Sequence, residues 1–147
     1  NYYLNLIEKG KGHILKGGRS LEINQRCQDG WFIEPTIIEG LSPDSKLIKE
    51  EIFGPVVTLH PFTSEAEAIK ISNETEYGLS ATIWTENSDK SQRVAKKVDA
   101  GVIWINCWMV RDLRTPFGGL KQSGLGKEGG SDALEFFTEK KNICTPS

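Results

Sequence analysis

The order of apolar and polar residues predicts a series of short helices and strands. Helical spacing of apolar side chains at the start predicts a helix to about Glu8, and a strand is expected at His13–Lys16. The polar stretch up to Gly30 is expected to be an exposed loop. Residues 31–38 have the composition of a strand, but Pro35 lacks the N–H that a central strand needs. This proline predicts an edge position or a bend.

The middle of the chain gives the clearest pattern. Ser64 and Glu67 have the spacing of a capping box at the start of a helix, and Asn87 or Ser88 is placed to cap a second helix. Strands are expected at 56–59, 79–85 and 101–106, with the apolar run Val102–Ile105 typical of a strand buried on both faces. Strands that alternate with helices through short connections predict an α/β fold, a parallel sheet with flanking helices.

A long Gly-rich loop follows, from Cys107 to Gly130, and then a helix to about Phe137. Loops of this length in compact domains are usually functional or disordered, and the large apolar side chains in it, such as Trp108 and Phe117, argue against disorder. The chain ends in an extended tail at Thr138–Thr145.

Composition and charge exclude several classes of function. The 147 residues carry 20 acidic and 18 basic side chains, which are interleaved and sum to −2, so no basic surface for nucleic acid is expected. The apolar runs are too short to cross a membrane. Cys27, Cys107 and Cys144 form no metal-ligand spacing with His13 or His60, so no metal site is expected. Widely spaced, odd-numbered cysteines favour a reducing, cytoplasmic setting.

Two motifs carry a resemblance to a known family. The first is Glu-Glu-Ile-Phe-Gly-Pro at 50–55, and the second is Pro-Phe-Gly-Gly-Leu-Lys-Gln-Ser-Gly at 116–124. In this order and with the α/β segments between them, they resemble the aldehyde dehydrogenase superfamily over essentially the whole chain. The resemblance implies a small-molecule aldehyde as substrate and NAD as cofactor, with NADP left open.

The resemblance implies roles for two residues of the first motif. Glu51 is expected to accept hydrogen bonds from the nicotinamide ribose, and Phe53 to pack beside the nicotinamide ring. The chemistry fits, because an ionised carboxylate accepts charge-assisted hydrogen bonds and an aromatic face positions a flat ring. The alternatives are a solvated acid at a helix end for Glu51 and core packing for Phe53.

The second motif and the segment before it are expected to shape the aldehyde pocket, and Phe117 is placed there as a substrate-binding residue. Arg111 makes the segment similar to the branch that acts on 2-aminomuconate or 2-hydroxymuconate semialdehyde, because a guanidinium binds a carboxylate through paired hydrogen bonds. Arg114 is the weaker candidate. The alternative is a surface ion pair of Arg111 or Arg114 with Asp112, and a betaine-aldehyde-type enzyme is the alternative substrate class.

No catalytic residue is assigned. The cysteines lack the Gly-Gln-x-Cys setting of the family's nucleophile, and the base glutamate and the cofactor's Gly-rich turn precede the matching region. Because Asn1 opens inside a predicted helix, we expect a C-terminal portion of a longer enzyme that is inactive alone. Residues 1–137 would belong to the catalytic domain, and residues 138–147 would form an oligomerisation arm. The alternative is an inactive interaction module that keeps this arm and adds it to a neighbouring sheet.

Overall fold

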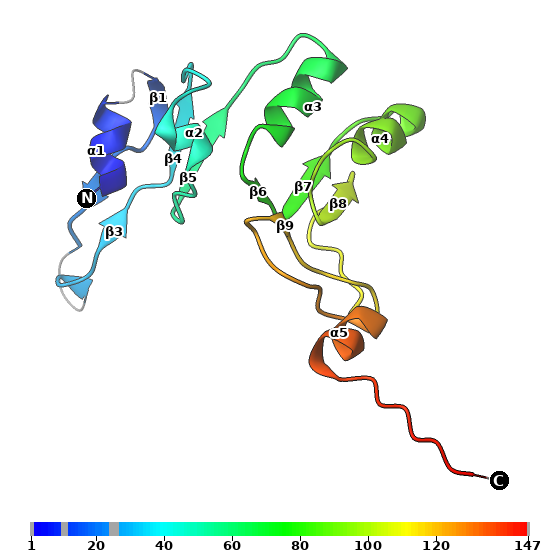
Figure 1. Cartoon of the computed structure of the whole chain (residues 1–147). Coiled ribbons are helices and arrows are strands. Elements are labelled where there is room, and N and C mark those ends of the chain that lie inside the picture. The colour runs from blue at the N-terminus through cyan, green and yellow to red at the C-terminus, as the bar shows by residue number, and fades with distance from the viewer. Residues whose placement is uncertain (1, 10–11, 24–26, 147) are drawn as a thin grey trace. The chain divides into compact units, whose positions relative to one another are not determined.

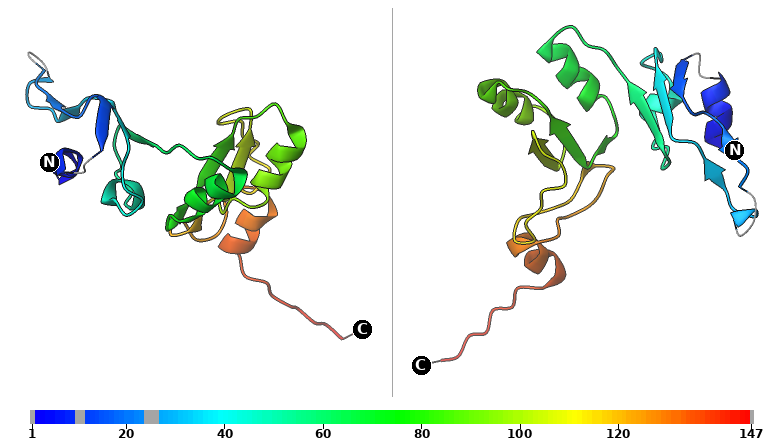
Figure 2. Two further views of the ribbon diagram at one scale, coloured as in Figure 1. Left: turned by 90° about the horizontal axis from the view of Figure 1, so that it is seen from above. Right: turned by 180° about the vertical axis from the view of Figure 1, so that it is seen from behind.

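The computed structural model describes residues 2–9, 12–23 and 27–146. The chain forms two compact units, Asn1–Thr63 and Ser64–Ser147, and each is described by itself (Figures 1 and 2). Both units combine helices with strands, so the predicted α/β class is confirmed.

The first unit is built on a small mixed sheet. Its strands are ordered β1-β4-β5, with β1 antiparallel to β4 and β4 parallel to β5. The expected helix at the start and the expected strands at 13–16 and 56–59 are confirmed. The elements of this unit are α1 (Tyr2–Lys9), β1 (His13–Lys16), β2 (Ser20–Leu21), β3 (Phe32–Ile33), β4 (Thr36–Glu39), α2 (Lys46–Lys49) and β5 (Val56–Leu59).

Pro35 marks a bend rather than a sheet edge. The expected strand at 31–38 is split into β3 and β4, and β4 is the central strand of its sheet. The proline lies just before β4, where no ladder hydrogen bond is lost, and the next N–H, that of Thr36, donates to the carbonyl of Pro55 at 2.8 Å. The stretch before Gly30 is not purely a loop, because β2 pairs with β3 in an antiparallel ladder.

The core of the first unit lies where α1 and α2 meet the sheet. Ile7, Ile38, Leu41 and Leu47 are buried there, and Ile38 of the central strand is only 1% exposed. Half-buried side chains of Ile48, Ile52, Leu6 and Val56 pack around them. Ile52 therefore ties the start of the Glu-Glu-Ile-Phe-Gly-Pro segment to this core.

The second unit has one βαβ crossover. The strands β7 and β8 pair in parallel, and α4 connects them along the chain. The strand β6 pairs antiparallel with β9. The side chain of Ser64 accepts from the N–H of Glu67 at 3.2 Å, and Asn87 caps the next helix, as predicted. The elements are α3 (Glu65–Asn73), β6 (Tyr77–Gly78), β7 (Ser80–Ile83), α4 (Ser88–Ala95), β8 (Val102–Ile105), β9 (Leu120–Lys121) and α5 (Gly130–Phe137).

The expected parallel strands are distributed over two sheets. β5 pairs with β4 in the first unit, whereas β7 and β8 form a separate two-stranded sheet. Alternation of strands and helices defines the order of elements but not which strands share a ladder. Trp104 is the one buried residue of β8, and its neighbours Val102, Ile103 and Ile105 are half-buried.

An ion pair joins the helices α3 and α4 of this unit. The Nε and Nη2 atoms of Arg93 on α4 lie 2.8 and 2.6 Å from the two carboxylate oxygens of Glu65 on α3. Hydrogen bonding to Arg93 lowers the pKa of Glu65 below its usual value. The pair therefore favours the folded state at neutral pH, and its contribution is lost as the pH falls through the lowered pKa.

The tail after α5 is an extended coil that leads away from this helix in every view (Figures 1 and 2). From residue 138 to residue 146 it forms no helix and no ladder with another described segment. Within the described ranges, no helix has the length and apolarity to cross a membrane.

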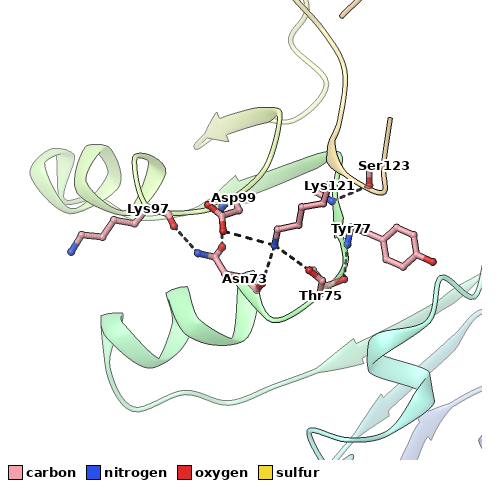
Figure 3. A network of polar contacts seen from close by, with 8 residues as sticks. Asn73, Thr75, Tyr77, Lys97, Asp99, Lys121 and Ser123 are labelled. Atoms are coloured by element: carbon pink, nitrogen blue, oxygen red, sulfur yellow. Dashed lines mark hydrogen bonds and ion pairs between the residues drawn. The ribbon is translucent and has the colours of Figure 1, made fainter. Parts of the chain in front are cut away.

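Lys121 fastens the Gly-rich segment to the end of α3 (Figure 3). Its ammonium donates to the carbonyls of Asn73 and Thr75 at 2.9 and 3.0 Å and lies 3.8 Å from a carboxylate oxygen of Asp99. These carbonyls stand at the carboxyl end of the helix, where a cation is favoured. Lys121 itself has a positive φ of 53°. The pairing of β9 with β6 maintains this conformation.

Asn73 connects the end of α3 to the segment that follows α4. Its amide nitrogen donates to the carbonyl of Lys97 at 2.8 Å, and its amide oxygen accepts from the N–H of Asp99 at 2.9 Å (Figure 3). On the other side, the hydroxyl of Ser123 accepts from the N–H of Gly78 at 2.9 Å. Three segments distant in sequence are thus held together by side chains that satisfy backbone groups.

Replacing Lys121 by methionine should destabilise the second unit. The change keeps the apolar stem but removes two hydrogen bonds from a charged donor, a loss of about 1–2 kcal/mol for this partly exposed group. Thermal unfolding of the complete native protein should show a lower Tm. Lys140→Met, at an ammonium 88% exposed in the tail, is the control and should leave the Tm unchanged. Equal Tm values for both variants would contradict the role of Lys121.

Candidate functional site

The first candidate segment follows α2 in the first unit. Glu50 ends that helix: its N–H donates to the carbonyl of Lys46 at 2.9 Å, and its carboxylate accepts from the hydroxyl of Tyr2 at 3.3 Å. Glu50 is thus engaged in local structure. The next carboxylate, that of Glu51, belongs to an exposed residue beyond the helix end.

Phe53 is presented to solvent in a strained backbone conformation. Its side chain is 92% exposed, and its φ of 52° lies in the left-handed region that bulky residues rarely adopt. Ile52 is held in the core before it, and the carbonyl of Pro55 is held by β4 after it. Anchors on both sides thus maintain a conformation that an isolated phenylalanine would leave, and such strain concentrates at ligand sites. Phe53 is therefore not part of the core of the first unit.

The second candidate segment begins where β8 ends. Asn106 has a φ of 51° and turns the chain, while its amide oxygen and nitrogen form 2.8 Å hydrogen bonds with the N–H and carbonyl of Thr85. Asparagine is among the few residues that tolerate this conformation. Four residues further, the carbonyl of Val110 accepts from the indole N–H of buried Trp104 at 2.8 Å. The loop is therefore fixed immediately before Arg111.

The guanidinium of Arg111 has two partners. It lies over the ring of Phe117, with its central carbon 4.2 Å from the ring centroid, and its Nη2 atom donates to a carboxylate oxygen of Glu128 at 3.0 Å. Phe117 is half-buried and contributes the face on which the cation rests. The structure therefore brings together two residues that the sequence proposed separately, Arg111 and Phe117.

Arg114 makes the alternative contact that the sequence left open. Its guanidinium pairs with the carboxylate of Asp112, at 2.9 Å from Nε to Oδ1. Hydrogen bonding to Arg114 holds the pKa of Asp112 below its usual value, so this carboxylate stays ionised at neutral pH. Arg111 pairs with Glu128 instead, which leaves Arg111 as the stronger candidate for an external anion.

The Gly-rich motif is packed backbone against backbone. A Cβ atom at Gly101 would lie 1.8 Å from the carbonyl oxygen of Gly118, so only glycine allows this approach. The ammonium of Lys127 then donates to the carbonyls of Gly118 and Gly119 at 2.8 and 2.7 Å. These contacts fix the residues that directly follow Phe117.

A cleft of about 550 Å³ opens beside this motif in the second unit. Arg111 is not among its lining residues, whereas Phe117 and Glu128 are. Its apolar wall is formed by Leu79, Phe117, Leu125, Phe136 and Phe137.

The structure also locates the groups that were given no catalytic role. Cys27 and Cys107 are half-buried, Cys144 is exposed, and all three are free thiols. Over residues 2–9, 12–23 and 27–146, no group of three or more His, Cys, Asp and Glu side chains is arranged to hold a metal ion.

Sequence reasoning missed three residues that build the site: Trp104 as an anchor, Lys127 as a clamp and Glu128 as the partner of Arg111. Their contacts join positions 6 to 17 residues apart, and each involves the irregular loop that follows β8. No periodicity relates such positions, so the sequence carries no signal for these pairs.

Comparisons with known proteins identify the family of the chain. The chain matches the aldehyde dehydrogenase family over residues 1–143 and belongs to that family. It is 48% identical over 144 residues to 2-hydroxymuconic semialdehyde dehydrogenase of Pseudomonas putida, which covers 98% of this chain. It is 47% identical over 128 residues, 87% of this chain, to human 2-aminomuconic semialdehyde dehydrogenase.

Solved structures give the same result. Indole-3-acetaldehyde dehydrogenase from P. syringae, in complex with NAD⁺ and IAA, is similar with a TM-score of 0.86 and 36% identity over 94% of this chain. Betaine aldehyde dehydrogenase from Staphylococcus aureus, in complex with NAD⁺, has a TM-score of 0.85 and 37% identity over 92% of this chain.

The chain is much shorter than these relatives. It spans 29% of the length of the Pseudomonas putida enzyme, 26% of the human enzyme and 27% of both solved structures.

Proposed function

We propose that this chain is part of an NAD-dependent aldehyde dehydrogenase that oxidises a carboxylate-bearing semialdehyde to the acid, with nicotinamide-binding residues in its first unit and substrate-binding residues in its second. The single observation that carries the proposal is Arg111, held on the ring of Phe117 in the segment before the Gly-rich motif. Relatives named as 2-hydroxymuconic and 2-aminomuconic semialdehyde dehydrogenases support this substrate class.

The residues of the first segment fit a nicotinamide nucleotide. The exposed residues Glu51 and Phe53 stand two positions apart on a segment anchored at both ends. Glu51 would accept hydrogen bonds from ribose hydroxyls, and Phe53 would support the nicotinamide ring. When bound, the cofactor supplies the hydride acceptor. The neighbours in complex with NAD⁺ support NAD as that cofactor.

Phe53→Gly should separate stability from cofactor binding. Glycine relieves the left-handed strain and removes no packing from a ring that is 92% exposed, so the free energy of unfolding should rise by about 1 kcal/mol. The same change should weaken the Kd for NAD⁺ in the complete native protein, measured by titration. Glu51→Gln should weaken this Kd roughly tenfold with no gain in stability.

Trp31→Gly is the matched control for Phe53→Gly. Trp31 is 90% exposed but is not among the residues with positive φ, so its replacement should neither stabilise the protein nor change the affinity for NAD⁺. Wild-type NAD⁺ affinity in both Phe53→Gly and Glu51→Gln would refute the cofactor assignment.

Charge distinguishes the proposed substrate from betaine aldehyde. The guanidinium of Arg111 is permanently positive, so it attracts a distal carboxylate and repels a trimethylammonium group. Arg114 is already paired with Asp112, whereas Arg111 uses one nitrogen for Glu128 and keeps other donors for a second anion. An acidic semialdehyde is therefore favoured over a betaine-type substrate.

The substrate class is tested by Arg111→Met, which keeps an apolar side chain against Phe117 but removes the charge. The complete native protein is assayed on 6-oxohexanoate and on hexanal, two six-carbon aldehydes that differ by a distal carboxylate. The ratio of their kcat/KM values should fall roughly 10- to 100-fold, the size expected for lost charge-assisted hydrogen bonds.

Arg114→Met is the control and should preserve this ratio, because Arg114 is paired with Asp112. An unchanged ratio in Arg111→Met would refute the carboxylate contact. A fall in Arg114→Met alone would move the contact to Arg114.

A second role is favoured by the tail. Residues 138–146 form no ladder with another described segment, and Ile143 is 79% exposed, which suits a strand added to the sheet of a neighbouring copy. We therefore propose homo-oligomerisation through residues 138–147, with residues 1–137 as part of the catalytic domain. Three free thiols support a cytoplasmic location.

The isolated 147-residue chain should associate without catalysing. We expect no cysteine-dependent, NAD⁺-dependent oxidation of hexanal or 6-oxohexanoate, because no cysteine lies in the family's nucleophile setting. Sedimentation should show self-association that is lost when residues 138–147 are removed. Measurable turnover would overturn the inactivity, and a monomer at every concentration would overturn the role of the tail.

A further inference from the structure

The contact between Arg111 and Glu128 depends on the pairing of the backbones of Phe117 and Glu128. The N–H of Phe117 donates to the carbonyl of Glu128 at 2.7 Å, and the N–H of Glu128 donates back at 2.8 Å. Residues paired in this antiparallel manner have neighbouring side chains on the same face. The ring of Phe117 and the carboxylate of Glu128 are thus presented side by side.

Together these two side chains define the orientation of the guanidinium. The ring, 4.2 Å from the central carbon of Arg111, determines the plane in which the group lies. The hydrogen bond from Nη2 to Glu128, at 3.0 Å, determines its rotation within that plane. A guanidinium has five N–H donors, and toward the described residues only Nη2 of Arg111 donates. The remaining donors stay available in a defined direction.

We propose that Glu128 is a positioning residue that orients Arg111 for the distal carboxylate of the substrate. It acts through Arg111 and not on the reacting atoms. This inference rests on the proposed contact between Arg111 and a substrate carboxylate.

Because Arg111 and Glu128 are partly exposed, their ion pair acts mainly by orienting the guanidinium and not by its electrostatic energy. The side chains of Arg111 and Glu128 are 37% and 66% exposed, so water screens their attraction and the pair adds little to stability. A purely electrostatic role would also have the opposite sign for function. A negative charge next to Arg111 repels an incoming carboxylate, so its removal would improve substrate binding.

The test compares Glu128→Ala with Glu128→Gln in the complete native protein, on 6-oxohexanoate and hexanal. Glu128→Ala should raise the KM for 6-oxohexanoate about fivefold relative to the KM for hexanal, the effect of one lost hydrogen bond, without lowering kcat. Glu128→Gln keeps an acceptor oxygen and should restore the wild-type ratio. Glu135→Ala, at an exposed glutamate on α5 that pairs with Lys140, is the control and should leave the ratio unchanged.

Three outcomes would overturn the proposal. A lower KM for 6-oxohexanoate in both Glu128 variants would mean that Glu128 acts by its charge. A lower kcat on both aldehydes in both variants would mean that it takes part in the chemistry. An unchanged KM ratio in Glu128→Ala, with an unchanged Tm, would mean that it does not orient Arg111.

A double-variant cycle separates this inference from the proposed function. If Glu128 acts through Arg111, Glu128→Ala should change nothing further in an Arg111→Met background. Additive effects of the two changes would overturn the inference. If Arg111→Met itself leaves the substrate ratio unchanged, the carboxylate contact fails. If Arg111→Met lowers the ratio and Glu128→Ala does not, only the positioning role fails.

Discussion

The ammonium of Lys121 holds the end of α3 to the Gly-rich motif, and the geometry of the long loop from Cys107 to Gly130 depends on this contact. One charged group satisfies the carbonyls of Asn73 and Thr75 at the carboxyl end of a helix, where the backbone has no partner of its own. Because Asn73 also binds the chain after α4, a single cluster fastens three segments. The motif's backbone can then approach Gly101 as closely as only a glycine permits.

From this scaffold the site is built by contacts of a few side chains and backbone groups. The Gly-rich backbone places Phe117 opposite Glu128, and both hold Arg111, while Trp104 fixes Val110 just before it. In the first unit, Phe53 is held in its strained conformation by Ile52 in the core before it and by the hydrogen-bonded carbonyl of Pro55 after it. In both units the residues proposed to meet a ligand are presented by neighbours that satisfy backbone groups or fill a core.

Patterns over a few residues predicted the local structure well. The strand at Val56–Leu59 and the cap at Ser64 follow from periodicity and from one short hydrogen-bonded motif, and both are confirmed. The pairing of strands could not be predicted, because the ladder partner of β5 depends on contacts that no local pattern encodes. The roles of Glu51 and Arg111 came from motif resemblance and stay predictions. The role of Glu128 could not be predicted, because its contact with Arg111 forms only when the loop has folded.

The most direct test of the central claim is a crystal structure of the complete native protein with NAD⁺ and adipate, the acid formed from 6-oxohexanoate. The account predicts one adipate carboxylate within about 3 Å of the free donors of Arg111, with the guanidinium still on Phe117 and still bonded to Glu128. It also predicts the nicotinamide ribose at Glu51. Adipate bound with both carboxylates away from Arg111, or a ribose far from Glu51, would contradict it.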